Sequence, residues 1–307
     1  MRSEFCNALV GRSGNENVLF MTGDLGYMAL EPLQEALGER FINAGVAEQN
    51  MISVAAALSR QGFEVWAYSI APFCYARPFE QIRNDIAFND LPVKLVGNGG
   101  GYAYGVMGPS HHAIEDYGVL LTLPNMRVYA PVFNEDISAV VNCLSSELRP
   151  SYLRLGRGEA PDGYVIPQYA AWRQLTYGDG IVIIAVGPLA STYIGAFEKL
   201  PKTQRPNLWA VAQMPISANP LPSELLSQIS SAPALCVAEE HVKRGGFASE
   251  LALYLAEGGK MPKQFRHHYA LAHTYGTYGS QQFLRSLSAL DEGTLLSTIA
   301  EFAPTSV

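Results

Sequence analysis

The sequence predicts an α/β protein of two doubly wound domains, in which helices cover both faces of mostly parallel sheets. Apolar strand-like runs alternate with helix-like stretches in both halves of the chain, and this order is typical of parallel sheets. The chain is also 307 residues long, more than the roughly 100–200 residues of an average domain. We therefore expect two cores, each with its own sheet.

The first half contains strand-like runs at residues 17–23, 64–71 and 92–101. Residues 50–62 between the first two predict a helix, because apolar side chains recur at i, i+3, i+4 and i+7 from Met51. Residues 79–88 repeat this pattern and predict the next helix. The resulting βαβα order defines the first domain.

Domain boundaries follow from where the periodic patterns stop. Two further strand-like segments, at residues 126–129 and 152–155, complete a first domain that we place at residues 1–160. Residues 161–176 lack clear periodicity and are predicted as a linker. A second, smaller domain of the same type is expected at residues 177–307.

Composition excludes several classes of function. A net charge of −7 argues against a nucleic-acid partner, and no basic block indicates a membrane surface. The four cysteines have no CxxC spacing, so neither a zinc site nor a disulfide framework is indicated. Because the N-terminus lacks a signal pattern and no apolar run approaches about 18 residues, we expect a cytoplasmic protein.

The strongest motif is GVAEQNM at residues 45–51, which follows a strand-like segment and opens the first predicted helix. This position puts the carboxylate of Glu48 at the end of a parallel strand, where ligands of such sheets bind. An isolated glutamate there would also be explained by its favourable interaction with the helix dipole. The motifs that follow decide between these interpretations.

Two further motifs carry reactive or aromatic side chains. The segment from residue 71 to residue 96 presents Phe73, Tyr75 and Phe79 between a strand end and a helix, where they would ordinarily be core residues. The motif GPSHH then places His111 and His112 after a Gly-Pro turn. Neighbouring histidines point in different directions and no HExxH pattern is present, so proton transfer or substrate binding suits them better than a metal.

Taken in order, GVAEQNM, APF with FEQIRNDIA, GPSHH, LPNMRVYAP and YLRLGRG resemble the pyrimidine-binding domain of transketolase-type thiamine-diphosphate enzymes. The second half resembles their C-terminal domain through VAEEHVKRGGFASELALYL. The resemblance extends over most of residues 1–300. The domain that binds the cofactor's diphosphate in this family has no counterpart here. The resemblance therefore implies the C-terminal subunit of a split transketolase.

The resemblance also implies roles in binding the cofactor. Glu48 matches the glutamate that shares a proton with N1′ of the aminopyrimidine ring, and a buried carboxyl suits this because desolvation brings its pKa closer to that of the ring nitrogen. Phe73 matches the aromatic residue that packs on the ring. Asp24 and Val46 are implied as further cofactor contacts, although Asp24 could equally be a turn or N-cap residue.

Substrate contacts are implied for three residues. His111 matches the histidine that lies over the thiazolium and stabilises charge on the substrate oxygen, and His112 would assist it. Arg157 matches the arginine that binds a substrate phosphate, although it could instead cap the linker. Met107 stands where typical transketolases carry an acidic residue, which predicts a modified-sugar acceptor.

The expected protein is thus a transferase that moves a two-carbon ketol unit from a ketose phosphate to an aldose or modified sugar. It would use thiamine diphosphate and Mg²⁺, with the metal ligands on a diphosphate-binding partner in an α2β2 assembly. The partners expected are this second chain and small sugar phosphates, with no nucleic acid and no membrane.

Three alternatives stay open on the sequence. A 2-oxo-acid dehydrogenase β subunit has the same two domains, and a 1-deoxyxylulose-phosphate-synthase-like subunit shares the paired histidines. A non-catalytic regulatory paralogue is the third alternative, against which the presence of both Glu48 and Phe73 argues. The glycine-rich segments 178–180 and 98–102 are interpreted as turns, because neither has the spacing of a diphosphate or nicotinamide motif.

Overall fold

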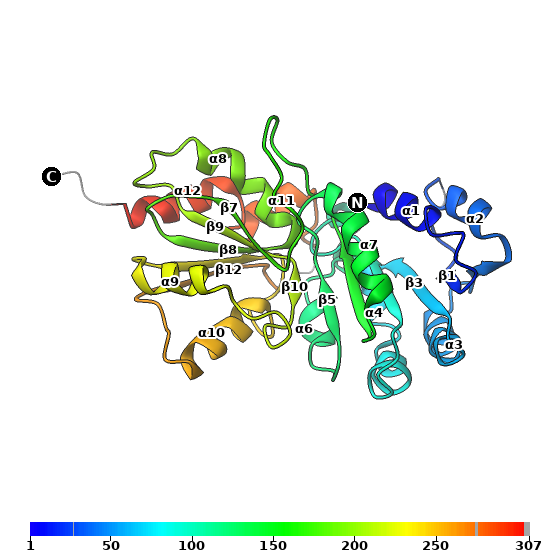
Figure 1. Ribbon diagram of the computed structural model, residues 1–307. Helices are drawn as coiled ribbons and strands as arrows, with labels where there is room; N and C mark the ends of the chain where they lie inside the picture. Colours follow the sequence, from blue (N-terminus) through cyan, green and yellow to red (C-terminus); the bar gives the residue numbers. More distant parts are fainter. Residues whose placement is uncertain (27, 274–275, 304–307) are drawn as a thin grey trace.

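A computed structural model describes residues 1–26, 28–273 and 276–303 and contains two sheets side by side (Figure 1). The first sheet has seven strands in the order β10-β5-β6-β4-β3-β1-β2, and the second has five in the order β12-β11-β8-β9-β7. All neighbouring strands are parallel except the pairs β10–β5 and β7–β9. The predicted fold class, two doubly wound α/β units, is confirmed.

The strands have the following bounds: β1 Val18–Thr22, β2 Phe41–Asn43, β3 Glu64–Ile70, β4 Lys94–Asn98, β5 Arg127–Tyr129, β6 Ser151–Leu155, β7 Trp172–Thr176, β8 Val182–Val186, β9 Asn207–Val211, β10 Gln213–Met214, β11 Leu235–Glu239 and β12 Phe265–Tyr269.

The α-helices are α1 Arg2–Val10, α2 Glu31–Leu37, α3 Glu48–Arg60, α4 Ala71–Tyr75, α5 Phe79–Gln81, α6 Asp116–Leu120, α7 Ile137–Ser146, α8 Ile194–Glu198, α9 Ser223–Ser231, α10 Phe247–Glu257, α11 Gln281–Leu287 and α12 Glu292–Glu301. Short η segments occupy Gly38–Arg40, Ile82–Ala87, Gly105–Met107, Pro109–His111, Asn134–Asp136 and Gly187–Tyr193.

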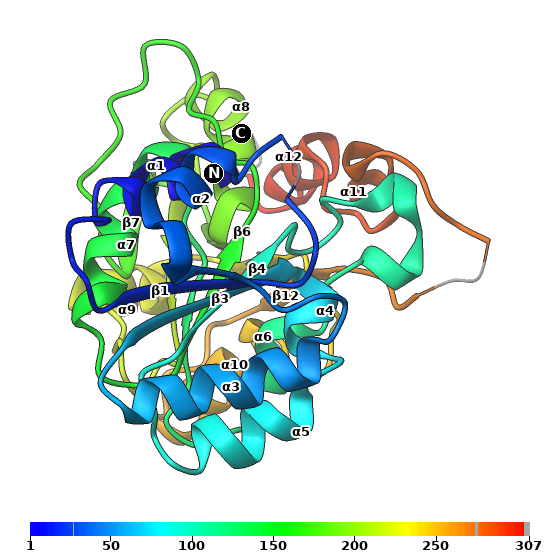
Figure 2. The same ribbon diagram turned by 90° about the vertical axis from the view of Figure 1, so that its right-hand side faces the viewer.

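Helices cover both faces of the first sheet because its strands are apolar on both sides (Figure 2). Phe20 and Trp66 belong to the cluster formed with α1, α2 and α7. Their chain neighbours Leu19 and Val65 belong to the opposite cluster, which contains α3. Side chains of a strand alternate between faces, so a run of buried apolar residues builds two cores at once.

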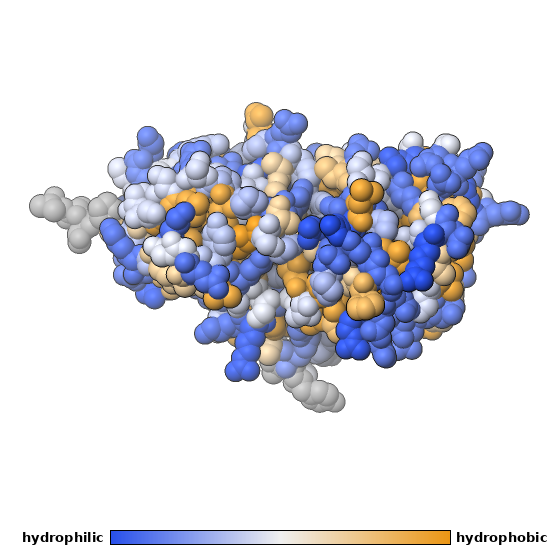
Figure 3. All heavy atoms as spheres, turned by 60° about the horizontal axis from the view of Figure 1, so that its bottom comes forward, coloured by the Kyte–Doolittle hydropathy of each residue, from blue (hydrophilic) through white to orange (hydrophobic). Residues whose placement is uncertain are grey.

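The second sheet is layered in the same way. Ile183 and Ala210 pack with α8 and α12 on one face, whereas Val182 and Val211 pack with α9 and α10 on the other. On the outside of the molecule, the face drawn in Figure 3 carries hydrophobic residues in small groups among polar ones.

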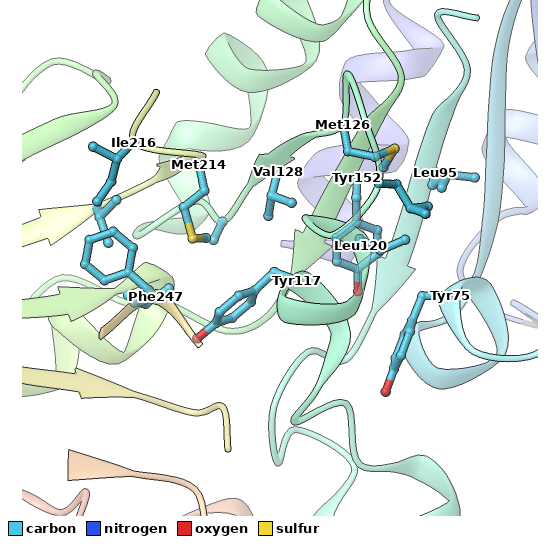
Figure 4. Packing of buried hydrophobic residues seen from close by; sticks show 14 of the residues in the cluster. Tyr75, Leu95, Tyr117, Leu120, Met126, Val128, Tyr152, Met214, Ile216 and Phe247 are labelled. Carbon is cyan, nitrogen blue, oxygen red and sulfur yellow. The ribbon is translucent and has the colours of Figure 1, made fainter. Parts of the chain in front are cut away.

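The two units share structure at the centre of the molecule. β10, which follows β9 of the second sheet, pairs antiparallel with β5 at the edge of the first. Met214 and Phe247 lie in the same buried cluster as Tyr117 and Val128 of the first half (Figure 4). Because apolar packing continues across this junction, the sheets form one body.

Comparison with the sequence interpretation gives close agreement for the longer elements. The helix predicted at 50–62 is α3, and residues 247–257 of the second half form α10. The helix predicted at 79–88 begins as α5 but widens to a π-helix at Ile82–Ala87. Residues 161–171 of the predicted linker are irregular, whereas residues 172–176, also placed in the linker, form the edge strand β7.

Within the described residues, no helix is long and apolar enough to cross a bilayer.

A buried ion pair joins β7 to the first unit and leads to a prediction on stability. Arg173 Nη1 donates to Asp136 Oδ1 at 2.8 Å, with both side chains 3% exposed. Arg173→Met leaves Asp136 buried with only the backbone N–H groups of Val132 and Phe133 as donors. We expect the free energy of unfolding to fall by about 3 kcal/mol, as measured by urea denaturation.

The matched control is Lys202→Met, which removes a charge from the exposed pair of Lys202 with Asp179, 3.9 Å apart. Exposed pairs contribute little because water screens them, so this variant should unfold like the wild type. Equal loss in both variants would contradict the role of the buried pair.

Candidate active site

Every residue predicted for the site follows a strand of the first sheet at its carboxyl end. Parallel strands end at one edge, and ligands of open α/β sheets bind there. The positions are Asp24 after β1, Val46 and Glu48 after β2, Phe73 after β3, His111 and His112 after β4, and Arg157 after β6.

Glu48 is the first residue of α3 and is 5% exposed. Its position in the first turn places the carboxylate against the positive end of the helix dipole. The neighbouring backbone is closely packed: a Cβ added at Gly23 would lie 3.3 Å from the carbonyl oxygen of Gly45 and 3.8 Å from Glu48 Cγ. The Glu48 side chain is therefore closely packed beside Gly23.

Arg77 connects Glu48 to Phe73. Its Nη1 lies 2.7 Å from Glu48 Oε1, and its Cζ lies 3.8 Å above the centroid of the Phe73 ring. The guanidinium is thus both ion-paired and stacked. The sequence interpretation did not single out Arg77, although it stands in the same ARPFEQ motif as the aromatic residues.

His111 lies beside Phe73, with ring centroids 5.2 Å apart in an edge-on arrangement. Tyr104 approaches its ring at 6.3 Å, and Ser110 Oγ lies 3.0 Å from His111 Nδ1. Gly99, with φ of +82°, makes room for Tyr104, since a Cβ there would lie 2.2 Å from the Tyr104 ring. Phe73 and His111 are therefore in contact, and Arg77 lies between Phe73 and Glu48.

His112 is buried and takes part in a second cluster. His112 Nε2 lies 3.2 Å from the carbonyl oxygen of Gly105, and its ring stacks on His273 with centroids 5.9 Å apart. Burial lowers the pKa of His112. His273 Nε2 is 2.8 Å from Glu115 Oε1, and Tyr75 Oη donates to Glu115 Oε2 at 3.2 Å. The second unit thus reaches the histidine loop through His273.

Arg157 is exposed and lines a cleft of about 1000 Å³ with Arg2, Asn98 and Tyr104. Arg285 lines it too, but pairs with Glu240 at 2.5 Å. Tyr104 therefore borders both this cleft and His111. The sequence interpretation missed Arg2, because nothing near it in the chain resembles a binding motif.

Among the described residues, no hydrogen bond, ion pair or ring contact joins Asp24 or Val46 to Phe73 or His111. Asp24 adopts φ of +55°, and its Oδ1 accepts a hydrogen bond from Asn43 Nδ2 at 3.0 Å. It thereby occupies the turn position that the sequence interpretation kept open. Val46 is 72% exposed. Cofactor contacts by these two residues stay predictions.

Comparison with known proteins decides the family. The model of the family described as "Transketolase, pyrimidine binding domain" matches residues 13–162. The chain belongs to the transketolase family.

The most informative transketolase relatives are proteins of comparable length. An apulose-4-phosphate transketolase subunit of Phocaeicola vulgatus is 28% identical, covering 83% of each chain. The "Putative transketolase C-terminal section" of Methanocaldococcus jannaschii is 29% identical, covering 93% of this chain and 90% of its own length. A solved "Split gene transketolase, inactive beta4 tetramer" is 28% identical with a TM-score of 0.83, covering 98% and 97%.

The residues of this transketolase chain fit the pyrimidine end of thiamine diphosphate. The nearly buried carboxylate of Glu48 could bind a ring nitrogen, and the face of Phe73 could stack on the ring. The Arg77 guanidinium contacts both side chains, and His111 lies against the Phe73 ring. A Cβ at Gly23 would lie 3.3 Å from the Gly45 carbonyl oxygen and 3.8 Å from Glu48 Cγ, so the missing side chain leaves room beside Glu48. No residue here is assigned to the diphosphate.

The pair of His273 and Glu115 predicts how stability depends on pH. The hydrogen bond that His273 donates to Glu115 raises the pKa of His273 above its ordinary 6.5. Burial would raise the pKa of Glu115, but His273 and Tyr75 lower it below 4.5. The His273 contribution is complete below pH 6.5 and lost as pH rises through the raised pKa. The Glu115 contribution is complete above pH 4.5 and lost as pH falls through the lowered pKa.

His273→Gln should therefore lower the melting temperature more at about pH 5.5 than at about pH 8.5, where His273 loses its proton in the wild type. Thermal unfolding of both proteins across this range measures the effect. A difference in melting temperature that grows toward alkaline pH would contradict the ion pair.

Proposed function

We propose that this chain is the pyrimidine-binding subunit of a split transketolase, which transfers a two-carbon ketol unit from a ketose phosphate to an aldehyde acceptor. One observation carries the proposal: a nearly buried Glu48 lies next to Phe73 and His111 at the carboxyl edge of a parallel sheet. The family match and the relatives that are themselves separate subunits support it.

Each residue of this group then has a defined task. When bound, thiamine diphosphate supplies the carbon nucleophile that breaks and forms the carbon–carbon bond. Glu48 holds a shared proton at the ring nitrogen N1′, and its burial keeps water from competing for that proton. Phe73 stacks on the pyrimidine ring. His111, at the edge of Phe73, donates a hydrogen bond to the substrate oxygen where charge develops.

The cleft that contains Arg157 suits the phosphate end of the substrate. Arg157 and Arg2 both line it, and guanidinium groups bind phosphate oxygens in pairs. Met107, 57% exposed, presents a thioether where an acidic residue would recognise a hydroxyl. We therefore propose a phosphorylated sugar as substrate. We also propose an acceptor sugar that is modified at or near the hydroxyl that an acidic residue would recognise. The relative named for apulose-4-phosphate agrees with a phosphorylated sugar.

A separate diphosphate-binding subunit is the proposed partner, and it would carry the Mg²⁺ ligands in an α2β2 assembly. Val46, two residues before the buried Glu48, is 72% exposed, and Val54 on α3 is 37% exposed. Apolar side chains around a site that needs dry surroundings are best covered by another protein chain. All four cysteines are unpaired, which agrees with the reducing cytoplasm that we propose as its location.

The central prediction concerns Glu48. In the complex with the diphosphate-binding subunit, Glu48→Gln should lower kcat for ketol transfer at least about a hundredfold, because an amide cannot exchange the proton. Ketol transfer from a ketose phosphate to a panel of aldehydes, with thiamine diphosphate and Mg²⁺, measures this. The control is Glu80→Gln, an exposed glutamate on α5, which should leave kcat unchanged.

The outcome of that assay also separates the alternatives. If the complex is inactive on sugars but releases carbon dioxide from a 2-oxo acid, the chain belongs with the dehydrogenase or synthase branch and the ketol-transfer proposal is wrong. If Glu48→Gln transfers ketol units at the wild-type rate, the assignment of Glu48 is wrong.

A second prediction concerns Arg157. Arg157→Met should raise KM for a phosphorylated acceptor about tenfold or more, since a hydrogen bond to a charged group is lost. The KM for the corresponding unphosphorylated aldehyde should stay the same. Steady-state kinetics on the two acceptors measure the difference, and an equal change in both KM values would place the phosphate elsewhere.

A further inference from the structure

We propose that Arg77 keeps the pyrimidine site of this chain closed until the cofactor displaces it, by occupying the carboxylate and the aromatic face that the pyrimidine ring requires. This inference rests on the proposed function and goes beyond it, because it makes the Arg77 side chain a gate, that is, a group that blocks the cofactor site until it is displaced.

The geometry of Arg77 carries the proposal. Its guanidinium is flat, lies 3.8 Å over the Phe73 ring and places Nη1 2.7 Å from Glu48 Oε1. An aminopyrimidine is also flat and would use the same aromatic face and the same carboxylate. A stacked planar group that donates to Glu48 therefore already fills the site.

The two occupants exclude each other. The Glu48 side chain is only 6% exposed, and Gly23 packs against it, since a Cβ on Gly23 would lie 3.8 Å from Glu48 Cγ. A ring cannot stack on this face of Phe73 and reach Glu48 while the guanidinium lies between them. Arg77 Nη1 also donates to Glu48 Oε1, so this oxygen is not free for a ring nitrogen until the guanidinium leaves.

Arg77 is placed so that it can leave without disturbing the core. It lies between α4 and α5, and its side chain is 45% exposed. Its backbone carbonyl accepts a hydrogen bond from Gln49 Nε2 at 3.3 Å, so the main chain is held while the side chain rotates toward solvent. Long charged side chains move in this way at little cost.

The test is direct binding of thiamine diphosphate in the presence of Mg²⁺. Equilibrium dialysis or calorimetry is performed on the complex with the diphosphate-binding subunit, for the wild type, Arg77→Met and Arg77→Lys. Arg77→Met should bind the cofactor about threefold to tenfold more tightly, because it has no ion pair or stacked cation to displace. Arg77→Lys should be intermediate, since it keeps the charge but loses the flat stacking group.

The matched control is Arg83→Met, an exposed arginine whose Nε donates to Asn84 Oδ1. It removes the same charge from the same region and should leave Kd unchanged. An equal tightening in Arg83→Met would indicate a general charge effect and overturn the gate. Unchanged cofactor binding by Arg77→Met would also contradict the proposal. Weaker binding would contradict it as well, because Arg77 would then be a lasting contact of the bound cofactor.

Salt provides a second readout. The pair is partly exposed, so rising ionic strength weakens it, and the ratio of the wild-type Kd to the Arg77→Met Kd should approach one. A ratio that stays constant with salt would contradict displacement of an ion pair. Failure of the wild-type complex to bind thiamine diphosphate at all would instead contradict the proposed function.

Discussion

The parallel pairing of β1, β2, β3, β4 and β6 is the constraint on which the rest of the structure depends. Thr22 pairs with Asn43 and Tyr68, and Asn98 pairs with Ile70 and Leu155. The carboxyl ends of these five strands therefore lie along one edge of the sheet. The segments that follow them therefore converge, although they are far apart in the sequence. Burial of the strands on both faces fixes this register, since a slip of one residue would exchange the two cores.

Buried charges at the junction of the two units hold the edge in a fixed shape. Arg154 donates to Asp116 Oδ2 at 2.7 Å and to the carbonyl oxygen of Glu240 at 3.0 Å. Glu239, fully buried, accepts hydrogen bonds from Tyr117 and from the N–H groups that open α10. Burial opposes the charge on Glu239, but His267, His241 and Tyr117 lower its pKa below 4.5. Such networks are costly to break because each charge would be left unpaired.

Much of this architecture could be predicted from periodicity and motif order. α3 and α10 have long apolar faces, and GVAEQNM follows a strand, so Glu48 was assigned to the sheet edge correctly. β7 was missed because Trp172–Thr176 mixes polar and apolar residues, and Arg173 and Gln174 are buried through partners elsewhere in the chain. Arg77 and the contact of His112 with His273 depend on side-chain direction and on segments far apart in sequence, which spacing does not encode.

The pairing of β10 with β5 has a consequence for biosynthesis. The edge of the first sheet stays open until Gln213 and Met214 have left the ribosome, long after β5 and β6 have been made. Until then the nascent chain presents an unpaired strand, together with the apolar surface around Val128 that Met214 later covers. Exposed edges of this kind pair with other chains, so a fragment that stops after β6 is a candidate for misassembly. The short strand β10 thus closes the edge of the first sheet with residues that are synthesised after the first strand of the second sheet.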